Sequence, residues 1–575
     1  MNVQELYRAW LKDFADDAAT VQELTAIRDN PAEIEDRFYT DLSFGTAGMR
    51  GVLGAGTNRM NRYTVRRAAA GMADYLLEQD ADAAAQRGVV IAYDSRRMSP
   101  EFAEDTALVM AARGVKALLF DALRPVPVLS FAVRHLKTAA GVVITASHNP
   151  PEYNGFKAYG PDGAQLSPEY AAGVTQHIQA LKYNGCHPMD RQEALDKGRL
   201  QIIGNKEVDD DYIAMLLTLV VNPKVLKEQG PKLNIVYTPL HGSGLVPVRR
   251  VLKEVGIGNV TIVKEQELPD PDFSTVEAPN PENPDAFELA IPLARQVGAS
   301  VIFGTDPDCD RLGVCVLDGE GTFRTLTGNQ IGVLLLHHIL SSRKAAGTLP
   351  TNGACIKSIV TTELARTICE DYGVEQFDVL TGFKFIGEKM QQFEDTGSHT
   401  FLFGFEESFG YLSSTHVRDK DGVNASLLIA EAACACMAEG ITLYDRLQQI
   451  FARYGYYSEK VVSKTLPGKD GLTDMRNLMA RLRGNPPSKA GSLNVLAVRD
   501  YKAGTRTAAG KTEALDCPPS DVLYYELEGG NWLCMRPSGT EPKIKLYVNA
   551  RSKASMAEAD ALRAELQQAG EAWLE

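Results

Sequence analysis

The chain has 575 residues, of which 44% are hydrophobic and 23% charged, as in ordinary globular proteins. At about 100–200 residues per domain, this length suggests roughly three to five domains. The 60 basic and 74 acidic side chains give a formal charge of −14, and no block of Lys or Arg interrupts it, which argues against nucleic acid or an anionic membrane as a partner.

Targeting and redox signals are weak. The N-terminal segment has no apolar signal-peptide core, and no apolar run approaches the ~20 residues of a membrane span. We therefore expect a cytoplasmic protein. The nine Cys are scattered without a CxxC pair, which indicates reduced, buried thiols.

Strand and helix patterns alternate along most of the chain. Apolar runs at 89–93, 115–120 and 141–145 predict strands, and Ser99-Pro100, with Ser99 as N-cap, predicts a helix that ends at Gly114. The pattern restarts twice. The second set has strands at 233–237, 260–263 and 301–304 with helices near 246–255 and 284–296, and the third has helices at 328–339 and 362–371 with strands at 354–360 and 399–404. This rhythm predicts three similar α/β units with mixed sheets.

The last part of the chain differs. Strands are expected at 458–465, 493–499, 522–527, 532–535 and 544–549, with helices at 472–483 and 555–574. Clustered strands with few helices predict a C-terminal α+β domain. Candidate linkers near 204–210, 317–322 and 452–457 divide the chain into domains at 1–205, 206–318, 319–452 and 453–575.

The first segment that can carry chemistry is TASHNPPEYNGFK at 145–157. It follows an apolar strand, so Ser147 is expected at a strand end, where the ligand sites of α/β proteins gather. Asn149-Pro150-Pro151 forbids a regular helix and predicts a rigid turn. The structural alternative is a plain turn that Ser147 and His148 cap.

The second segment is GTDPDCDR at 304–311. Asp306, Asp308 and Asp310 alternate on a short loop, and hard carboxylate oxygens suit Mg²⁺. Without a cation, three clustered carboxylates would repel one another and raise their pKa values. A loop of solvated acids in Asx-turns is the alternative, and the choice between Mg²⁺ and Mn²⁺ stays open.

Two further segments suggest a sugar phosphate. In GFEESFG at 404–410, Glu406 and Ser408 alternate, would project on the same side of an extended segment and can bind adjacent sugar hydroxyls. In RPSGTEPK at 536–543, Arg536 offers a bidentate fork, while Ser538, Gly539 and Thr540 offer hydroxyls and backbone N–H groups to a phosphate. A polar loop and a β-turn are the respective alternatives.

These four segments, in this order, resemble the motifs of the α-D-phosphohexomutase family over nearly the whole chain. The segments GTAGMRG at 45–51 and TGFKFIG at 381–387 add to the resemblance. It implies four domains around a central cleft, three of them α/β and the last α+β. It also implies a phosphorylated Ser147 that completes a Mg²⁺ site with Asp306, Asp308 and Asp310.

The resemblance implies an activity as well: interconversion of glucose 1-phosphate and glucose 6-phosphate through glucose 1,6-bisphosphate. The Glu-Glu-Ser-Phe-Gly form is typical of phosphoglucomutases, and Gly410 stands where phosphomannomutases usually have His. The GTAGMRG opening is similar to that of a subgroup with phosphopentomutases and sugar-bisphosphate synthases. Phosphopentomutase, phosphomannomutase and glucose-1,6-bisphosphate synthase therefore remain alternatives, as do a phosphoserine hydrolase and a non-catalytic sensor. Oligomeric state stays open.

Roles for single residues follow from the same resemblance. Lys157 is the first candidate for proton transfer, with Arg50 and His148 beside it. The expected partners are small sugar phosphates, and the expected substrate-binding residues are Thr46, Arg311, Lys384, Glu406, Ser408, Arg536, Ser538, Gly539 and Thr540.

Overall fold

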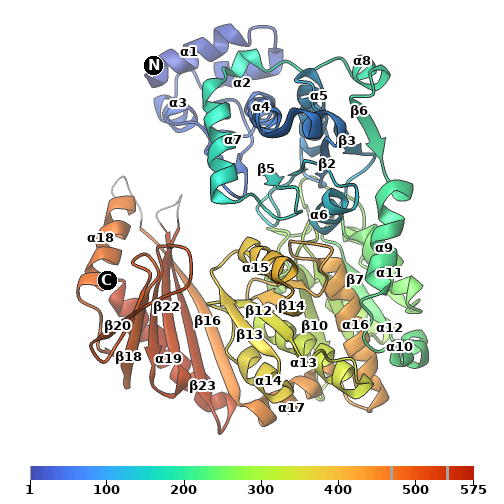
Figure 1. Cartoon of the computed structure of the whole chain (residues 1–575), viewed down its shortest axis with the longest axis vertical. Coiled ribbons are helices and arrows are strands. Elements are labelled where there is room, and N and C mark those ends of the chain that lie inside the picture. Colours follow the sequence, from blue (N-terminus) through green and yellow to red (C-terminus); the bar gives the residue numbers. More distant parts are fainter. Residues whose placement is uncertain (1, 467–470, 539–542) are drawn as a thin grey trace.

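The computed structural model describes residues 2–466, 471–538 and 543–575. Figure 1 shows four units in an arc: the first at the top, the second at the right, the third at the lower centre and the fourth at the lower left. Three mixed α/β sheets and one antiparallel sheet follow one another along the chain, which confirms the predicted fold class. The division at 1–205, 206–318, 319–452 and 453–575 stays a prediction.

The first sheet has the order β1-β5-β4-β2-β3-β6, with parallel pairing from β4 to β6 and antiparallel pairing of β5 and β1. Its strands are β1 (Met49–Val52), β2 (Val89–Tyr93), β3 (Ala117–Phe120), β4 (Ala140–Ile144), β5 (Tyr153–Tyr159) and β6 (Leu200–Ile203). The helices of this part are α1 (Val3–Asp13), α2 (Ala18–Ala26), α3 (Pro31–Phe38), α4 (Arg62–Gln86), α5 (Ser99–Ala112), α6 (Val126–His135), α7 (Pro168–Ala180) and α8 (Arg191–Asp196).

The second and third sheets repeat this plan. The second, β11-β10-β9-β7-β8, consists of β7 (Ile235–Thr238), β8 (Val260–Ile262), β9 (Val301–Thr305), β10 (Leu312–Leu317) and β11 (Phe323–Thr325), with α9 (Asp210–Leu217), α10 (Pro223–Gln229), α11 (Leu245–Glu254) and α12 (Ala290–Val297). The third, β13-β12-β14-β15, consists of β12 (Gly353–Ser358), β13 (Glu375–Val379), β14 (Thr400–Glu406) and β15 (Gly410–Leu412), with α13 (Gly328–Ala346), α14 (Leu364–Tyr372), α15 (Phe383–Thr396), α16 (Gly422–Ala438) and α17 (Leu443–Tyr454).

The fourth sheet is antiparallel throughout, in the order β16-β23-β22-β21-β18-β19-β20 with β17 paired to β18. Its strands are β16 (Tyr456–Thr465), β17 (Lys489–Ala490), β18 (Leu493–Asp500), β19 (Thr505–Ala508), β20 (Lys511–Ala514), β21 (Leu523–Leu527), β22 (Trp532–Pro537) and β23 (Lys543–Ser552), accompanied by α18 (Gly471–Gly484) and α19 (Met556–Trp573). Because ten residues of β16 pair with β23, the strand that enters this domain is firmly part of its sheet.

The three α/β sheets place their sequence motifs at equivalent positions. In each, the last parallel strand turns back into an antiparallel neighbour: β4 into β5, β9 into β10 and β14 into β15. The connecting loops carry Ser147, the Asp306–Asp310 segment and Ser408, respectively. Each loop also holds a non-glycine residue with positive φ, namely Ser147, Cys309 and Phe409. Three similar hairpins therefore place three different sets of polar side chains at the carboxyl ends of strands, where ligand sites of α/β proteins gather.

Several local expectations needed correction. Helix α5 has Met98 at its N-cap, in left-handed conformation, and Ser99 is its first residue, because the Ser99 hydroxyl bonds Asp94 instead of capping the helix. The helix expected near 284–296 is a short 3₁₀ turn followed by α12, and the linker expected at 317–322 is the turn that joins β10 to β11.

The segment 418–421 joins the first three domains. The Tyr159 hydroxyl donates to Asp419 at 2.9 Å, and the Tyr212 hydroxyl donates to Asp421 at 2.9 Å. The backbone N–H of Arg418 donates to the Ser130 hydroxyl at 2.9 Å. One apolar cluster also runs through all three sheets. The loops of these domains are thus held in fixed relation to one another.

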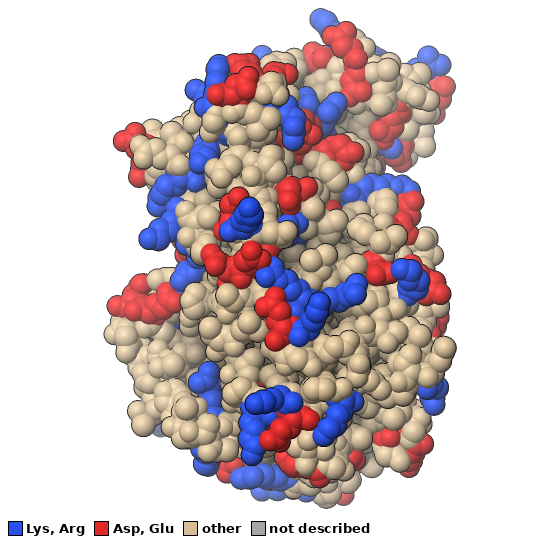
Figure 2. Space-filling view, turned by 90° about the vertical axis from the view of Figure 1, so that its right-hand side faces the viewer, with Lys and Arg blue, Asp and Glu red and all other residues tan. Residues whose placement is uncertain are grey.

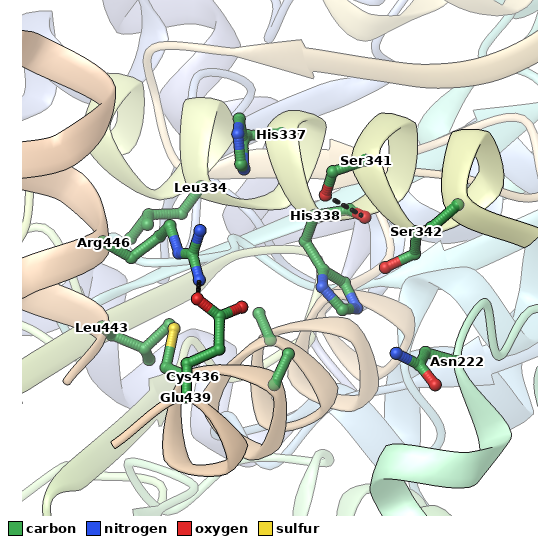
Figure 3. Close-up of a pocket in the computed structure, with 13 residues that line it drawn as sticks. Asn222, Leu334, His337, His338, Ser341, Ser342, Cys436, Glu439, Leu443 and Arg446 are labelled. Carbon is green, nitrogen blue, oxygen red and sulfur yellow. Dashed lines mark hydrogen bonds and ion pairs between the residues drawn. The ribbon is translucent and has the colours of Figure 1, made fainter. Parts of the chain in front are cut away.

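A second joint connects the second and third domains. His338 on α13 lies 3.3 Å from the carboxylate of Glu431 on α16, which accepts the backbone N–H of Asn222 at 2.5 Å. His338 and Asn222 line a hollow of about 250 Å³. Figure 3 shows them facing it, with the ion pair of Arg446 and Glu439 at its other end. None of the residues that line this hollow belongs to the four motifs.

Charged side chains, thiols and apolar helices are distributed as follows in the described residues. Figure 2 shows Lys and Arg interspersed with Asp and Glu over the face drawn there. All nine Cys are free thiols, and eight of them are buried. In the described ranges no single helix is long and apolar enough to cross a membrane, and α16 and α17 reach that threshold only as a pair bent by 85°.

Candidate active site

Ser147 lies in the first hairpin loop and is only 3% exposed. Its hydroxyl donates a 2.9 Å hydrogen bond to Asp306 Oδ2 and lies 3.1 Å from His148 Nδ1. Its φ of 55° is in the left-handed region, which costs a non-glycine residue about 1–2 kcal/mol. The loop therefore holds Ser147 in a strained conformation with its hydroxyl against the acidic loop of the second domain.

The acidic loop gathers three buried carboxylates. One oxygen each of Asp306, Asp308 and Asp310 lies within 4.8 Å of the others. Burial raises the pKa of Asp306, and the charges of Asp308 and Asp310 add to this rise. Burial acts in the same direction on Asp310, but Lys420, Lys157 and Arg311 outweigh it and lower that pKa. Mutual repulsion is therefore only partly relieved by neighbouring cations.

The donor set fits a divalent metal ion. Asp308 Oδ1 and Asp310 Oδ1 are buried without a hydrogen-bond partner, and such orphaned oxygens are costly unless something binds them. Three anionic oxygens at this spacing are ligands that hard cations prefer. The residues present could thus hold a divalent ion beside the Ser147 hydroxyl.

Lys157 lies on β5, opposite Val143 of β4. Its ammonium donates to Asp308 Oδ2 at 2.6 Å and lies 3.6 Å from Asp310 Oδ2. Burial lowers the pKa of Lys157, but the two carboxylates raise it by more. A bound cation would compete with Lys157 for the same carboxylates. The role of Lys157 in proton transfer stays a prediction.

The other residues expected near the serine lie at different depths. Burial, Arg311 and Arg50 lower the pKa of His148 well below its usual value. Arg50 is exposed on β1 and donates to the Asn149 side chain at 2.8 Å. Thr46 lies in a tight turn that Gly45 and Gly48 close by two backbone hydrogen bonds of 2.8 Å.

Arg311 connects the acidic loop with its surroundings. Its backbone N–H donates to Asp306 Oδ1 at 3.0 Å, and its guanidinium is paired with Glu282. The Arg311 side chain is 15% exposed. This guanidinium is therefore close to Asp310, 3.8 Å away, but is held by Glu282.

Glu406 is the last residue of β14 and is buried. Its carboxylate accepts the backbone N–H of Gly382 at 2.7 Å. Burial and then Glu407 raise the pKa of Glu406 to about 7, while Lys420, the Gly382 N–H and Arg311 act in the opposite direction.

Ser408 and Lys384 accompany Glu406 in the third domain. Ser408 is half-buried in the turn after β14. Lys384 lies in the first turn of α15, with its ammonium 4.7 Å from the centre of the Phe385 ring. Burial lowers the pKa of Lys384, whereas Glu388 and Glu169 act to raise it.

Arg536 lies on β22 and is half-buried. It is opposite Lys545 on β23. Burial, then Arg536, lower the pKa of Lys545, whereas Glu407 and Glu282 act to raise it. The strand pair β22 and β23 of the fourth domain thus lies within electrostatic reach of the loop that carries Glu406 and Ser408.

The turn beyond Arg536 is described only in part. The Ser538 N–H donates to the Lys543 carbonyl at 2.7 Å. Gly539 and Thr540 lie outside the described residues.

The chain matches four profiles described as "Phosphoglucomutase/phosphomannomutase": α/β/α domain I at residues 41–184, domain II at 210–319, domain III at 327–454 and the C-terminal domain at 487–566. The chain belongs to this family. It is a phosphohexomutase, an enzyme of the isomerase class, and the family is metal-dependent.

Relatives in the family match almost end to end. The chain is 38% identical over 523 residues to "Phosphoglucomutase" of Staphylococcus haemolyticus, which covers 90% of this chain and 91% of the relative. It is also 38% identical to "Phosphoglucomutase" of Staphylococcus aureus strain MRSA252, over 90% of this chain and 92% of the relative.

Solved structures share the fold. A putative phosphomannomutase from Thermus thermophilus is 23% identical with a TM-score of 0.67, covering 92% of this chain and 99% of its own. The open form of pp63/parafusin from Paramecium is 16% identical with a TM-score of 0.69, covering 93% and 96%.

The phosphohexomutase site also contains residues that sequence reasoning missed. Lys420 pairs with Asp310 at 3.1 Å, and Asp94 and Arg96 contact the serine loop. Lys420 is one of four consecutive charged residues at 418–421, directly before an apolar helix. Charged residues next to an apolar helix were a sequence signal that could have indicated a buried functional site. Asp94 and Arg96 directly follow the buried strand β2, at the strand end where ligand sites gather.

Proposed function

We propose that this chain interconverts glucose 1-phosphate and glucose 6-phosphate through a phosphorylated Ser147 and a glucose 1,6-bisphosphate intermediate. The observation that carries the proposal is the 2.9 Å contact between the Ser147 hydroxyl and Asp306, within a buried carboxylate triad. The glucose preference is supported by the curated relatives named phosphoglucomutase.

The metal in this proposal is Mg²⁺, held by Asp306, Asp308 and Asp310, with an oxygen of phosphorylated Ser147 as a further ligand. When bound, it supplies positive charge beside the phosphoryl group that transfers. Lys157 contacts Asp308 at the same place, and a cation bound to that carboxylate would lower the pKa of Lys157 and favour its neutral amine.

The chemistry at Ser147 is a displacement at phosphorus. A substrate hydroxyl forms the new P–O bond, the bond between phosphorus and Ser147 Oγ breaks, and the hydroxyl proton passes to a nearby base. Lys157 is our first candidate for this proton, with Arg50 supporting charge and His148, 3.1 Å from Ser147 Oγ, as the second candidate. The bisphosphate then turns around, and its other phosphoryl group returns to Ser147.

Binding in two orientations requires contacts that tolerate both ends of the sugar. We assign sugar hydroxyls to Glu406 and Ser408, and further substrate contacts to Thr46, Arg311 and Lys384. The distal phosphate is assigned to Arg536 together with Ser538, Gly539 and Thr540, because these groups bind phosphate without regard to the sugar.

We expect Arg536→Ala to raise the KM for glucose 1-phosphate about 10–100-fold, since charge-assisted hydrogen bonds contribute about 1.5–3 kcal/mol. Arg506→Ala is the matched control, because Arg506 is in the same domain and pairs only with Glu513 and Glu526 among the contacts described. Steady-state kinetics on both variants measure the effect. An unchanged KM in Arg536→Ala would contradict the assignment.

A pH dependence follows from Glu406. Its pKa of about 7 keeps the carboxyl protonated below neutrality, and only the ionised form accepts hydrogen bonds with both oxygens. Between pH 8 and pH 6 we expect this one group to lower kcat/KM about tenfold. Glu406→Gln should be slower but should lack this limb, and titration of the substrate phosphate affects both enzymes equally. Identical pH profiles for the two enzymes would refute the prediction.

A panel of sugar 1-phosphates tests the activity itself. Fastest turnover of glucose 1-phosphate supports the proposal. Preference for ribose 1-phosphate would indicate a phosphopentomutase instead, and preference for mannose 1-phosphate a phosphomannomutase. Accumulation of bisphosphate when 1,3-bisphosphoglycerate is supplied as donor would indicate a glucose-1,6-bisphosphate synthase. Stoichiometric release of inorganic phosphate would indicate a hydrolase, and binding without turnover a sensor.

A further inference from the structure

Arg96 is buried beneath the serine loop. It lies between β2 and α5, is 1% exposed, and is among the largest fully buried side chains of the described chain. Its guanidinium donates to four carbonyls of one segment: Ser147 at 2.6 Å, Asn149 at 2.5 Å, Pro150 at 2.9 Å and Tyr153 at 3.1 Å. A single planar fork therefore fixes the whole turn that follows the nucleophile.

Asp94 holds the backbone N–H of Ser147 through Thr145. Its carboxylate accepts the Thr145 hydroxyl at 2.6 Å, and that hydroxyl accepts the backbone N–H of Ser147 at 2.8 Å. Asp94 and Arg96 are themselves paired at 3.3 Å. Both the N–H and the carbonyl of Ser147 are thus bound, directly or through Thr145, to residues only two positions apart.

This double attachment explains how a serine keeps a left-handed backbone. Ser147 has a φ of 55°, a conformation that persists only where its surroundings over-determine it. The Arg96 guanidinium also lies 4.9 Å from the centre of the Phe273 ring, which belongs to the second domain. The acidic loop is in that domain, so Arg96 contacts both halves of the site.

We propose that Asp94 and Arg96 are positioning residues that set the direction of the Ser147 side chain toward the metal site. The inference rests on the proposed phosphoserine mechanism. The same serine must give and receive a phosphoryl group in each cycle, so Oγ has to return to one place. A misplacement of about 1 Å in such a reaction costs about 10²-fold in rate.

The test compares Arg96→Lys with Arg67→Lys. Arg67 is also a buried arginine of the first domain, 7% exposed, and donates to the carbonyls of Ile178 and Leu181 at 3.0 Å. Both changes replace a fork by an ammonium inside the same domain. We expect Arg96→Lys to lower kcat about 10²-fold with KM changed less than about threefold, and Arg67→Lys to keep kcat within about threefold of the wild type.

A second readout separates positioning from loss of structure. Each enzyme is loaded with phosphate on Ser147 and mixed with glucose 6-phosphate, and transfer to the sugar is compared with release to water. Arg96→Lys should shift the partition toward water at least about tenfold relative to Arg67→Lys, because the misdirected phosphoryl group stays exposed to attack. Equal partition and equal kcat in the two variants would overturn the proposal.

Thr145→Val and Thr145→Ser keep the proposal testable should Arg96→Lys fail to fold. Valine removes the hydroxyl that links Asp94 to the Ser147 N–H, and serine retains it. We expect low kcat in Thr145→Val and recovery in Thr145→Ser. Equal rates in both would reject the attachment. Wild-type enzyme without phosphate on Ser147 would instead reject the proposed function, independently of these variants.

Discussion

Ser147→Ala is expected to lower kcat by about four orders of magnitude or more, even with glucose 1,6-bisphosphate supplied. The Ser147 hydroxyl is the one that donates to Asp306. The Thr145 hydroxyl also reaches the triad, but it is already bound to Asp94 and should not replace Ser147 as the phosphoryl carrier. The free energy of unfolding should change by only about 1 kcal/mol, since one hydrogen-bonding hydroxyl is lost. Kinetics and thermal melts on the same preparation measure both quantities.

Ser130→Ala is the control for this variant. Ser130 is a buried serine of the first domain whose hydroxyl donates to the Gly163 carbonyl at 2.7 Å and accepts the Arg418 N–H at 2.9 Å, and neither bond involves Ser147 or the three aspartates. It should lose some stability and keep its kcat. Turnover by Ser147→Ala at the rate of Ser130→Ala would eliminate Ser147 as the phosphoryl carrier.

The second large effect concerns the triad. Asp306→Asn should lower kcat about 10³-fold, because weaker metal binding removes several kcal/mol of charge stabilisation. In the metal-free protein the same change should not lower the melting temperature, since it removes one of three buried carboxylates that lie within 4.8 Å of one another. Activity should thus fall while metal-free stability does not.

Added Mg²⁺ distinguishes the two contributions. Ligand that binds only the folded state raises the melting temperature, so Mg²⁺ should stabilise the wild type more than Asp306→Asn. Asp318→Asn is the control: Asp318 is a buried carboxylate of the same domain, paired with Arg324 at 2.8 Å, and should leave kcat and the Mg²⁺ effect intact. Equal stabilisation of wild type and Asp306→Asn would contradict the metal assignment.

The sequence predicted the α/β rhythm because buried parallel strands are continuous apolar runs, such as 89–93, which is β2. It failed for β5, where Asn154, Gly155 and Lys157 interrupt the apolar pattern and two prolines precede the strand. Lys157 was therefore expected in a loop, although it is held on a strand beside β4. The short strands β19 and β20 were missed because they are polar and largely exposed.

The site was predictable where the chemistry is local in sequence. The three aspartates converge because they share one tight loop, and their alternation suggested a metal site, with a loop of solvated acids as the alternative. Contacts between distant segments were not predictable: Arg96 to the carbonyl of Ser147, and Lys420 to Asp310. The first pair depends on which strands lie side by side in one sheet, and the second on how loops of different domains face one another; no local spacing encodes either.

Labelled phosphate followed from Ser147 to sugar decides whether this serine is the carrier. The enzyme is phosphorylated with labelled phosphate, the modified residue is mapped by peptide mass spectrometry, and glucose 6-phosphate is added in a single turnover. We predict that the label leaves Ser147 for glucose 1,6-bisphosphate at least as fast as kcat. Label that stays on the protein, maps to another residue, or appears only as inorganic phosphate would contradict the mechanism.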